Sequence, residues 1–103
     1  MTTNRTAPAN VRKAAREGWR LHKSGYRGGT KVGWARARQL SGGREVSDND
    51  VLAMYAYFAR HAVDRRPWWK NPPTPGYVAW MLWGGDAGRS WATREREKLM
   101  ARR

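Results

Sequence analysis

The chain has 103 residues, with 21 Lys and Arg against 8 Asp and Glu, and no Cys. This length supports a single core, and the lack of Cys excludes disulfides, thiolate metal sites and thiol catalysis. Eleven bases but only two acids precede Val46, so +9 of the net charge of +13 lies in less than half the sequence. The self-repulsion favours a polyanionic partner: nucleic acid first, then an acidic membrane or acidic protein. A basic surface kept for solubility is the plain alternative, although such a surface normally mixes both signs.

We expect neither a membrane-spanning protein nor a secreted one. The longest nearly uncharged apolar stretch, Tyr77–Trp83, is far shorter than the roughly 20 residues of a membrane-spanning helix. The N-terminus has no basic-then-apolar signal pattern, so we expect a protein that is not secreted and remains in the compartment where it is made.

Capping residues and Gly or Pro stops bracket five helical patterns, and patterns of period two are missing. The sequence therefore predicts an all-α fold, a single compact domain of about five short helices. We expect the helices near residues 8–23, 31–40, 48–61, 75–83 and 87–101. Residues 1–7 are polar with nothing to pack, so we expect a flexible arm there and a single helical domain over residues 8–103.

The first helix carries the sharpest functional signal. At 100° per residue its apolar residues form one arc, and five bases occupy the opposite arc: Arg12, Lys13, Arg16, Arg20 and Lys23. A solvated face normally places Glu four residues from Lys or Arg, whereas here Arg12, Arg16 and Arg20 repel at that spacing. The stripe, with only Glu17 at its margin, predicts a binding surface for a polyanion.

The second helix extends the predicted surface. Lys31, Trp34 and Arg38 share one of its faces, Arg36 lies nearer its apolar side, and a ring among bases suits contact with phosphates and bases. The alternative role for Trp34 is burial in the core. The predicted nucleic-acid site comprises Arg12, Lys13, Arg16, Arg20, Lys23, Arg27, Lys31, Trp34, Arg36, Arg38 and Arg44.

The second half of the chain is expected to supply most of the core. We predict burial of Tyr55, Phe58, Trp80 and Trp83, with Asp86 capping the last helix.

The loop at residues 64–74 has its own composition. Its adjacent Trp68 and Trp69 stand between bases and could stack on unpaired nucleic-acid bases or fold back over the core. Asp64 is expected to pair with a neighbouring Arg, Arg60 or Arg65.

Two resemblances appear in these motifs. Residues 57–91, with Phe-Ala-Arg-His at 58–61, Trp-Gly-Gly-Asp-Ala-Gly at 83–88 and Trp91, resemble a small domain of tailed-phage genomes. That domain occurs alone or joined to larger phage proteins near head-assembly genes. With Val32 and residues 35–38 the resemblance extends over most of residues 10–100. It implies a phage setting and no particular chemistry.

The second resemblance covers a shorter segment. Residues 35–44, followed by Ser47 and the helix over 51–58, resemble the back half of phage-repressor-type helix-turn-helix domains. In those domains a recognition helix ends in a glycine turn and a capped core helix follows.

No catalytic constellation is evident. His22 and His61 are isolated, carboxylates are not clustered, and no glycine loop leads into Gly-Lys-Ser/Thr, so we expect no enzyme, no metal and no cofactor. The leading hypothesis is a small basic phage-type protein that binds nucleic acid, DNA in preference to RNA, through the phosphates of duplex DNA and with modest sequence preference. The alternative is a phage assembly or host-interaction module whose basic face binds an acidic phage or host protein. The expected location is the cytoplasm of a bacterial host, free or associated with the virion.

Overall fold

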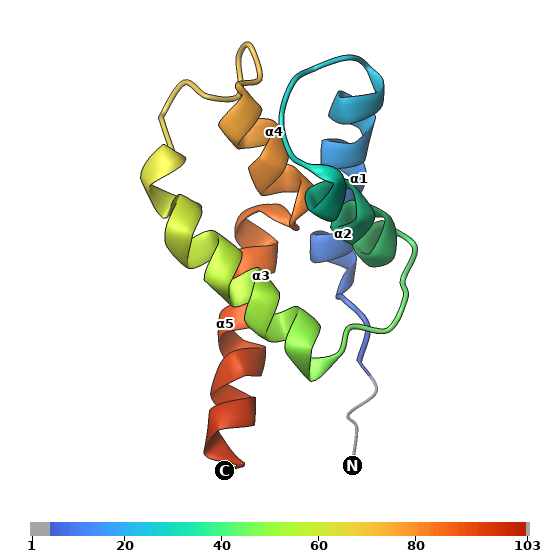
Figure 1. Ribbon diagram of the computed structural model, residues 1–103, viewed down its shortest axis with the longest axis vertical. Helices are drawn as coiled ribbons and strands as arrows, with labels where there is room; N and C mark the ends of the chain where they lie inside the picture. The colour runs from blue at the N-terminus through green and yellow to red at the C-terminus, as the bar shows by residue number, and fades with distance from the viewer. Residues whose placement is uncertain (1–4, 103) are drawn as a thin grey trace.

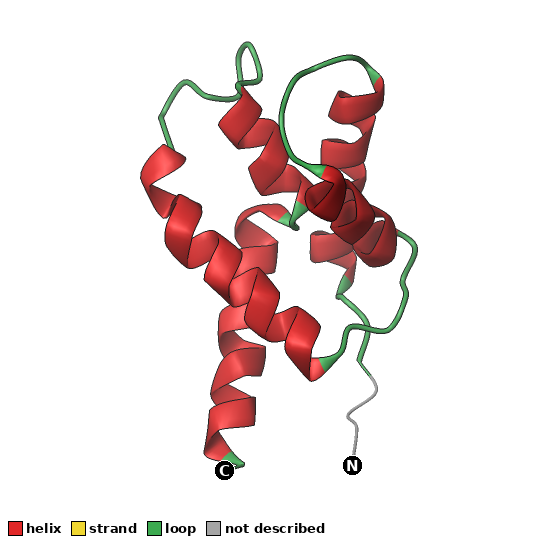
Figure 2. Ribbon diagram, viewed as in Figure 1, coloured by secondary structure: helices red, strands yellow, loops and turns green. Residues whose placement is uncertain are grey.

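The computed structural model describes residues 5–102. Within this range it has five α-helices, one short 3-10 turn and no strand (Figures 1 and 2). The elements are α1 (Ala9–Lys23), α2 (Lys31–Ser41), α3 (Asp48–His61), η1 (Ala62–Asp64), α4 (Pro75–Leu82) and α5 (Gly85–Ala101). The predicted all-α fold of five short helices is therefore confirmed.

Local chemistry explains where the later helices begin. Ser47 and Asp50 form a reciprocal capping box at the start of α3, and the Thr74 hydroxyl accepts a hydrogen bond from the Tyr77 amide at the start of α4. Between α4 and α5, Gly84 and Gly85 have φ angles of 113° and 65°, in the left-handed region that favours glycine. These glycines turn the chain directly from one helix into the next.

Asp86 does not cap α5 as predicted. Gly84 holds the N-cap position, and Asp86 lies in the first turn of the helix. Its carboxylate oxygen Oδ1 instead accepts a hydrogen bond of 2.9 Å from Trp80 Nε1. The prediction was wrong because the two glycines allow the helix to begin two residues earlier.

The helices pack in two connected groups. α1 contacts α2, α4 and α5, and α3 packs mainly on α5; Figure 1 shows α2 and α4 beside α1 and α3 crossing α5. The contact between α1 and α4 is closest at Gly18, where an added Cβ would lie 2.6 Å from the Met81 carbonyl carbon. Packing against both α2 and α4 leaves only one side of α1 exposed to solvent.

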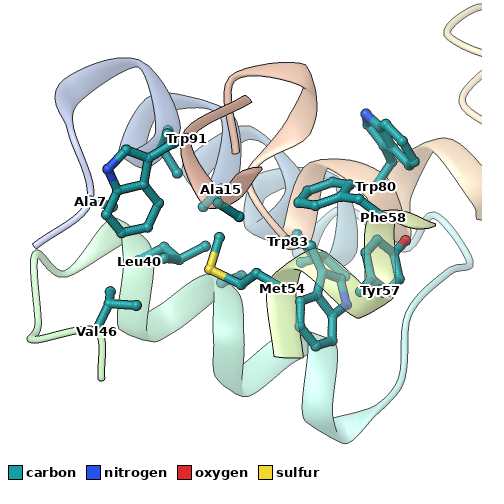
Figure 3. Packing of buried hydrophobic residues seen from close by; sticks show 14 of the residues in the cluster. Ala7, Ala15, Leu40, Val46, Met54, Tyr57, Phe58, Trp80, Trp83 and Trp91 are labelled. Carbon is teal, nitrogen blue, oxygen red and sulfur yellow. The ribbon is translucent and has the colours of Figure 1, made fainter. Parts of the chain in front are cut away.

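Aromatic rings fill much of the core (Figure 3). Phe58 meets Trp80 edge-on, with ring centroids 4.8 Å apart, and Tyr57 stacks on Trp83 at 4.5 Å. Both arrangements are favoured for aromatic pairs. The predicted burial of Phe58, Trp80 and Trp83 is confirmed.

The predicted burial of Tyr55 is wrong. Tyr55 is only half-buried, with the Arg96 guanidinium 4.3 Å from its ring centroid, and Tyr57 takes the core position. Two residues along a helix differ by about 200°, so one of these rings faces the core when the other does not. Burial raises the pKa of the Tyr57 phenol above its usual range.

The expected flexible arm is wrong for Arg5, Thr6 and Ala7, while residues 1–4 lie outside the described part of the chain. The Arg5 side chain is 7% exposed, 2.6 Å from Asp48 Oδ1 and 3.1 Å from Glu95 Oε1. It also donates a hydrogen bond to the Val46 carbonyl, and Ala7 is buried in the core. The segment is held in place because the carboxylates of Asp48 in α3 and Glu95 in α5 both contact the Arg5 guanidinium.

The core assignment can be tested with Trp80→Ala. Removing this almost fully buried ring leaves a cavity next to Phe58, so we expect a loss of about 3–5 kcal/mol in the free energy of unfolding. Denaturant unfolding followed by circular dichroism measures it. A variant as stable as the wild-type protein would contradict this description of the core.

Candidate nucleic-acid interface

The predicted stripe on α1 is exposed in the structure. Lys13, Arg16, Arg20 and Lys23 are all exposed, and they line an open hollow of about 920 Å³ along the outer side of the helix. At a rise of 1.5 Å per residue, the stripe runs for about 15 Å. Arg12 lies at its edge, half-buried, with Nη1 turned toward the Gly43 turn after α2.

One base of the stripe is neutralised locally. Arg20 Nε donates a hydrogen bond of 2.9 Å to Glu17 Oε2, and a second guanidinium nitrogen bonds the other carboxylate oxygen. The hydrogen bond from Arg20 lowers the pKa of the Glu17 carboxyl and raises that of the guanidinium. Lys13, Arg16 and Lys23 therefore carry most of the uncompensated charge of the stripe.

The aromatic rings of Trp19, His22 and Trp34 connect α2 to the stripe on α1. Trp19 lies between two cations, with Lys23 Nζ 5.9 Å and the Arg38 guanidinium 5.8 Å from its ring centroid. His22 follows Trp19 and stacks on Trp34 at 4.4 Å. Arg38 thus joins the α1 bases at one edge, and we call Lys13, Arg16, Arg20, Lys23 and Arg38 the basic ridge.

Trp34 is a structural ring rather than an open stacking surface. It is half-buried between the helices, and its Nε1 donates a hydrogen bond of 3.3 Å to the Gly28 carbonyl. The sequence also gave no reason to single out Trp19, which lies at the margin of the apolar arc. Its role as the ring between Lys23 and Arg38 depends on where α2 lies.

The remaining predicted bases lie around α2. Arg27 is exposed in the loop before this helix. Lys31 and Arg44 are exposed and line a second open hollow, together with Gln39 and Glu45. They belong to the same basic half of the molecule but line a different hollow from the α1 stripe.

Arg36 is a predicted site residue whose charged group is engaged within the fold, although its side chain also lines the second hollow. Its side chain is 11% exposed, its Nη1 lies 2.8 Å from Asp50 Oδ1, and its guanidinium lies 5.1 Å from the Trp83 ring centroid. Because Arg36 faces the start of α3, its charge pairs with Asp50 and stabilises the fold.

The carboxylate that holds Arg36 is strongly perturbed. Burial by itself raises the pKa of Asp50, but hydrogen bonds from Arg36, the Ser47 amide and Gln39 outweigh it. As a result, the pKa of this carboxyl lies well below its usual range. Asp50 thereby joins α2 to the capping box of α3.

Trp68 and Trp69 are adjacent in the sequence but differ in their exposure to solvent. Trp69 is 5% exposed and packs on Tyr77 and Trp80, with ring centroids 5.4 and 5.6 Å away. Trp68 is 63% exposed. Folding back over the core therefore describes Trp69, and stacking on an unpaired base stays a prediction for Trp68 alone.

The predicted ion pair of Asp64 with Arg60 or Arg65 is wrong. Asp64 Oδ2 lies 2.9 Å from His61 Nδ1, one helical turn earlier, while Arg65 pairs with Asp86 at 2.9 Å. The loop carries Arg65 toward α5 and away from Asp64.

Most of the basic half lacks acidic partners. Within residues 5–102, eight of the predicted bases form no ion pair: Arg12, Lys13, Arg16, Lys23, Arg27, Lys31, Arg38 and Arg44. On α5, Lys98 pairs with Glu95 and Arg96 covers Tyr55, while Arg89, Arg94 and Arg96 also form no ion pair with the described residues. What distinguishes α1, α2 and the segments that flank them is the scarcity of acids, because only two precede Val46.

Other kinds of site find little support in the described residues. They hold no group of three His, Cys, Asp or Glu side chains placed to bind a metal ion, and none of their helices is long and apolar enough to cross a membrane. Comparison of the chain with family models, curated proteins and solved structures finds no match. The resemblances to phage domains stay predictions.

The Asp50 contacts predict a pH dependence of stability. Because the folded pKa is below the unfolded value of about 3.9, the stabilisation is present above that pH and is lost as the pH falls further. Asp50→Asn should therefore be less stable than wild type near about pH 6, with a smaller difference near about pH 2.5. Urea unfolding at both pH values measures it. An equal difference at both would contradict an ionic origin.

Proposed function

We propose that this protein binds duplex DNA by placing the basic ridge on the phosphate backbone. The observation that supports the proposal is the run of exposed cations on α1, continued by Arg38 across Trp19, without acidic partners except at Arg20. Holding like charges together costs free energy, and a polyanion offsets that cost. Coverage by α2 and α4 leaves these side chains on the one open side of α1.

The dimensions of the ridge suit a nucleic-acid backbone. Phosphates of B-DNA follow one another every 3.4 Å of helix axis on each strand, so the ridge of about 15 Å spans roughly four of them. Lys and Arg side chains line the hollow, and such side chains commonly pack their apolar stems along a surface while the charged ends stay in water. This arrangement brings several cations to one strand without deep burial of any of them.

Duplex DNA suits the ridge better than a single strand. Binding of single strands relies on rings with open faces, whereas Trp19 and Trp34 are half-buried and already stack with His22 or carry cations. Among residues 5–102, Asn10 is the only amide side chain that lines the hollow, so we expect few contacts to base edges. We therefore expect modest sequence preference.

The salt dependence tests the electrostatic part of the proposal. If Lys13, Arg16, Lys23 and Arg38 each meet one phosphate, log K should fall against log salt with a slope of about −4, at roughly −0.9 per phosphate. Fluorescence anisotropy with a labelled 16-base-pair duplex of random sequence measures it across a salt series. A flat response would contradict the proposal, and tighter binding to an acidic polypeptide than to DNA would favour the assembly module.

A matched pair of variants tests the location of the surface. Lys13→Gln with Arg16→Gln removes two exposed ridge bases that form no ion pair, so the salt slope should fall by about two in magnitude, with the melting temperature almost unchanged.

The control is Arg60→Gln with Arg94→Gln, which removes the same charge from exposed positions on α3 and α5. It should leave the slope close to that of the wild-type protein. A larger decrease of the salt slope in the control than in the ridge variant would place the binding surface on the other side of the molecule.

A further inference from the structure

A half-enclosed hollow of about 350 Å³ lies under the loop before α4, and we call it the loop pocket. Its walls include the aromatic side chains of Trp69, Tyr77 and Trp80. Three cations of the loop also line it: Arg65, Arg66 and Lys70. Its volume falls in the range of small-ligand sites, in which a few polar groups converge on an apolar wall.

The aromatic wall is fixed before any ligand binds. Arg65 lies 5.4 Å from the Trp80 ring centroid and pairs with Asp86, and Asp86 in turn accepts the hydrogen bond from Trp80 Nε1. The Trp69 amide donates to the Arg66 carbonyl at 3.2 Å, and the Thr74 amide donates to the Trp69 carbonyl at 2.9 Å. Asp86 is the one acid among the described residues that line the pocket, and it is already bound to Arg65 and to Trp80 Nε1.

Two cations remain available at the rim. Lys70 is exposed and forms no side-chain hydrogen bond or ion pair within residues 5–102. Arg66 is exposed and uses only Nη1, which donates to the carbonyls of Val63 and Arg65. Cations above a wall of rings match a flat aromatic base that carries a phosphate.

Tyr77 adds a polar group to the wall. Burial raises the pKa of its phenol, and the negative charges of Glu17 and Asp86 raise it further. The phenol therefore keeps its proton at neutral pH and places no negative charge beside a bound phosphate.

The loop pocket adjoins the basic ridge. Ala14 of α1 and Met81 of α4 line both this pocket and the open hollow along α1. Glu17, which pairs with Arg20 of the ridge, acts electrostatically on Tyr77 inside the pocket. A strand whose backbone follows the ridge can thus continue directly into the pocket.

We propose that the loop pocket binds one unpaired nucleotide, with its base against Tyr77, the half-buried ring of the wall, and its phosphate at Arg66 and Lys70. The rings of Trp69 and Trp80 are 5% and 1% exposed, so they form the buried backing of the wall and do not contact the base directly. For a nucleotide at the end of a strand, the inference rests on the proposed function of the ridge. The same chemistry is offered by a free nucleoside monophosphate, and the experiment separates the two sources.

The first arm compares two labelled duplexes, one blunt and one with a single-strand overhang of two nucleotides. Stacking of one base on a ring should make the wild-type protein bind the overhang about fivefold tighter or more. Lys70→Gln should bring this ratio toward one and leave binding of the blunt duplex unchanged. Lys13→Gln with Arg16→Gln should weaken both duplexes and keep the ratio.

The second arm titrates deoxyadenosine monophosphate by calorimetry, with inorganic phosphate as the control. Binding of the nucleotide and not of phosphate, lost in Lys70→Gln, supports the pocket. If no duplex binds in the first arm while the nucleotide binds in the second, the pocket takes free nucleotides and the ridge is overturned. An overhang ratio of one, with no preference for the nucleotide over phosphate, overturns the pocket. Salt-dependent binding of the blunt duplex would then still support the ridge.

Discussion

The close approach of α1 to α4 at Gly18 is the contact on which both proposed surfaces depend. An added Cβ there would lie 2.6 Å from the Met81 carbonyl carbon and 2.8 Å from the Leu82 Cα, so only glycine allows the two backbones this close. The contact turns the bases of α1 toward solvent. It also places Ala14 next to Met81, where the hollow along the ridge and the loop pocket share a wall.

The acids and bases of this chain serve different purposes. Half of the eight acids join distant parts of the fold: Asp48 and Glu95 bind Arg5, Asp50 binds Arg36, and Asp86 binds Arg65 and Trp80. Few acids are left to neutralise the first half of the chain, where Glu17 alone pairs with a ridge base. The positive surface follows from the excess of bases over acids in the sequence, because each structural pair takes up a base as well as an acid.

The helices were predictable because their signals are local. Ser47 with Asp50, Thr74 with Pro75, and the glycine turns act within a few residues of the helix ends that they define. The exposed stripe on α1 followed from the helical period alone. That same local information led to the wrong tyrosine on α3, because Tyr57 is buried by Trp80 and Trp83 from the α4 region, whereas Tyr55 meets Arg96 of α5 and stays half-buried.

The features that the sequence did not reveal depend on distant residues. Arg5 is ordered by carboxylates 43 and 90 positions away, and the Arg36 guanidinium is engaged by Asp50 of the next helix. The loop pocket combines α1, α4, the start of α5 and the loop that follows η1, so no single segment carries its pattern. Charge and helical period thus indicate where we expect a partner, while packing determines which of the predicted residues are exposed.

Nuclear magnetic resonance gives the most direct test of the central claim, that the basic ridge meets the phosphate backbone of duplex DNA. Titration of ¹⁵N-labelled protein with a short blunt duplex should shift the backbone amides of α1 and those around Arg38, with the largest changes near Arg16 and Lys23. Amides in the second half of α5 should remain in place. Shifts confined to α5 and α3, with α1 unaffected, would contradict the account.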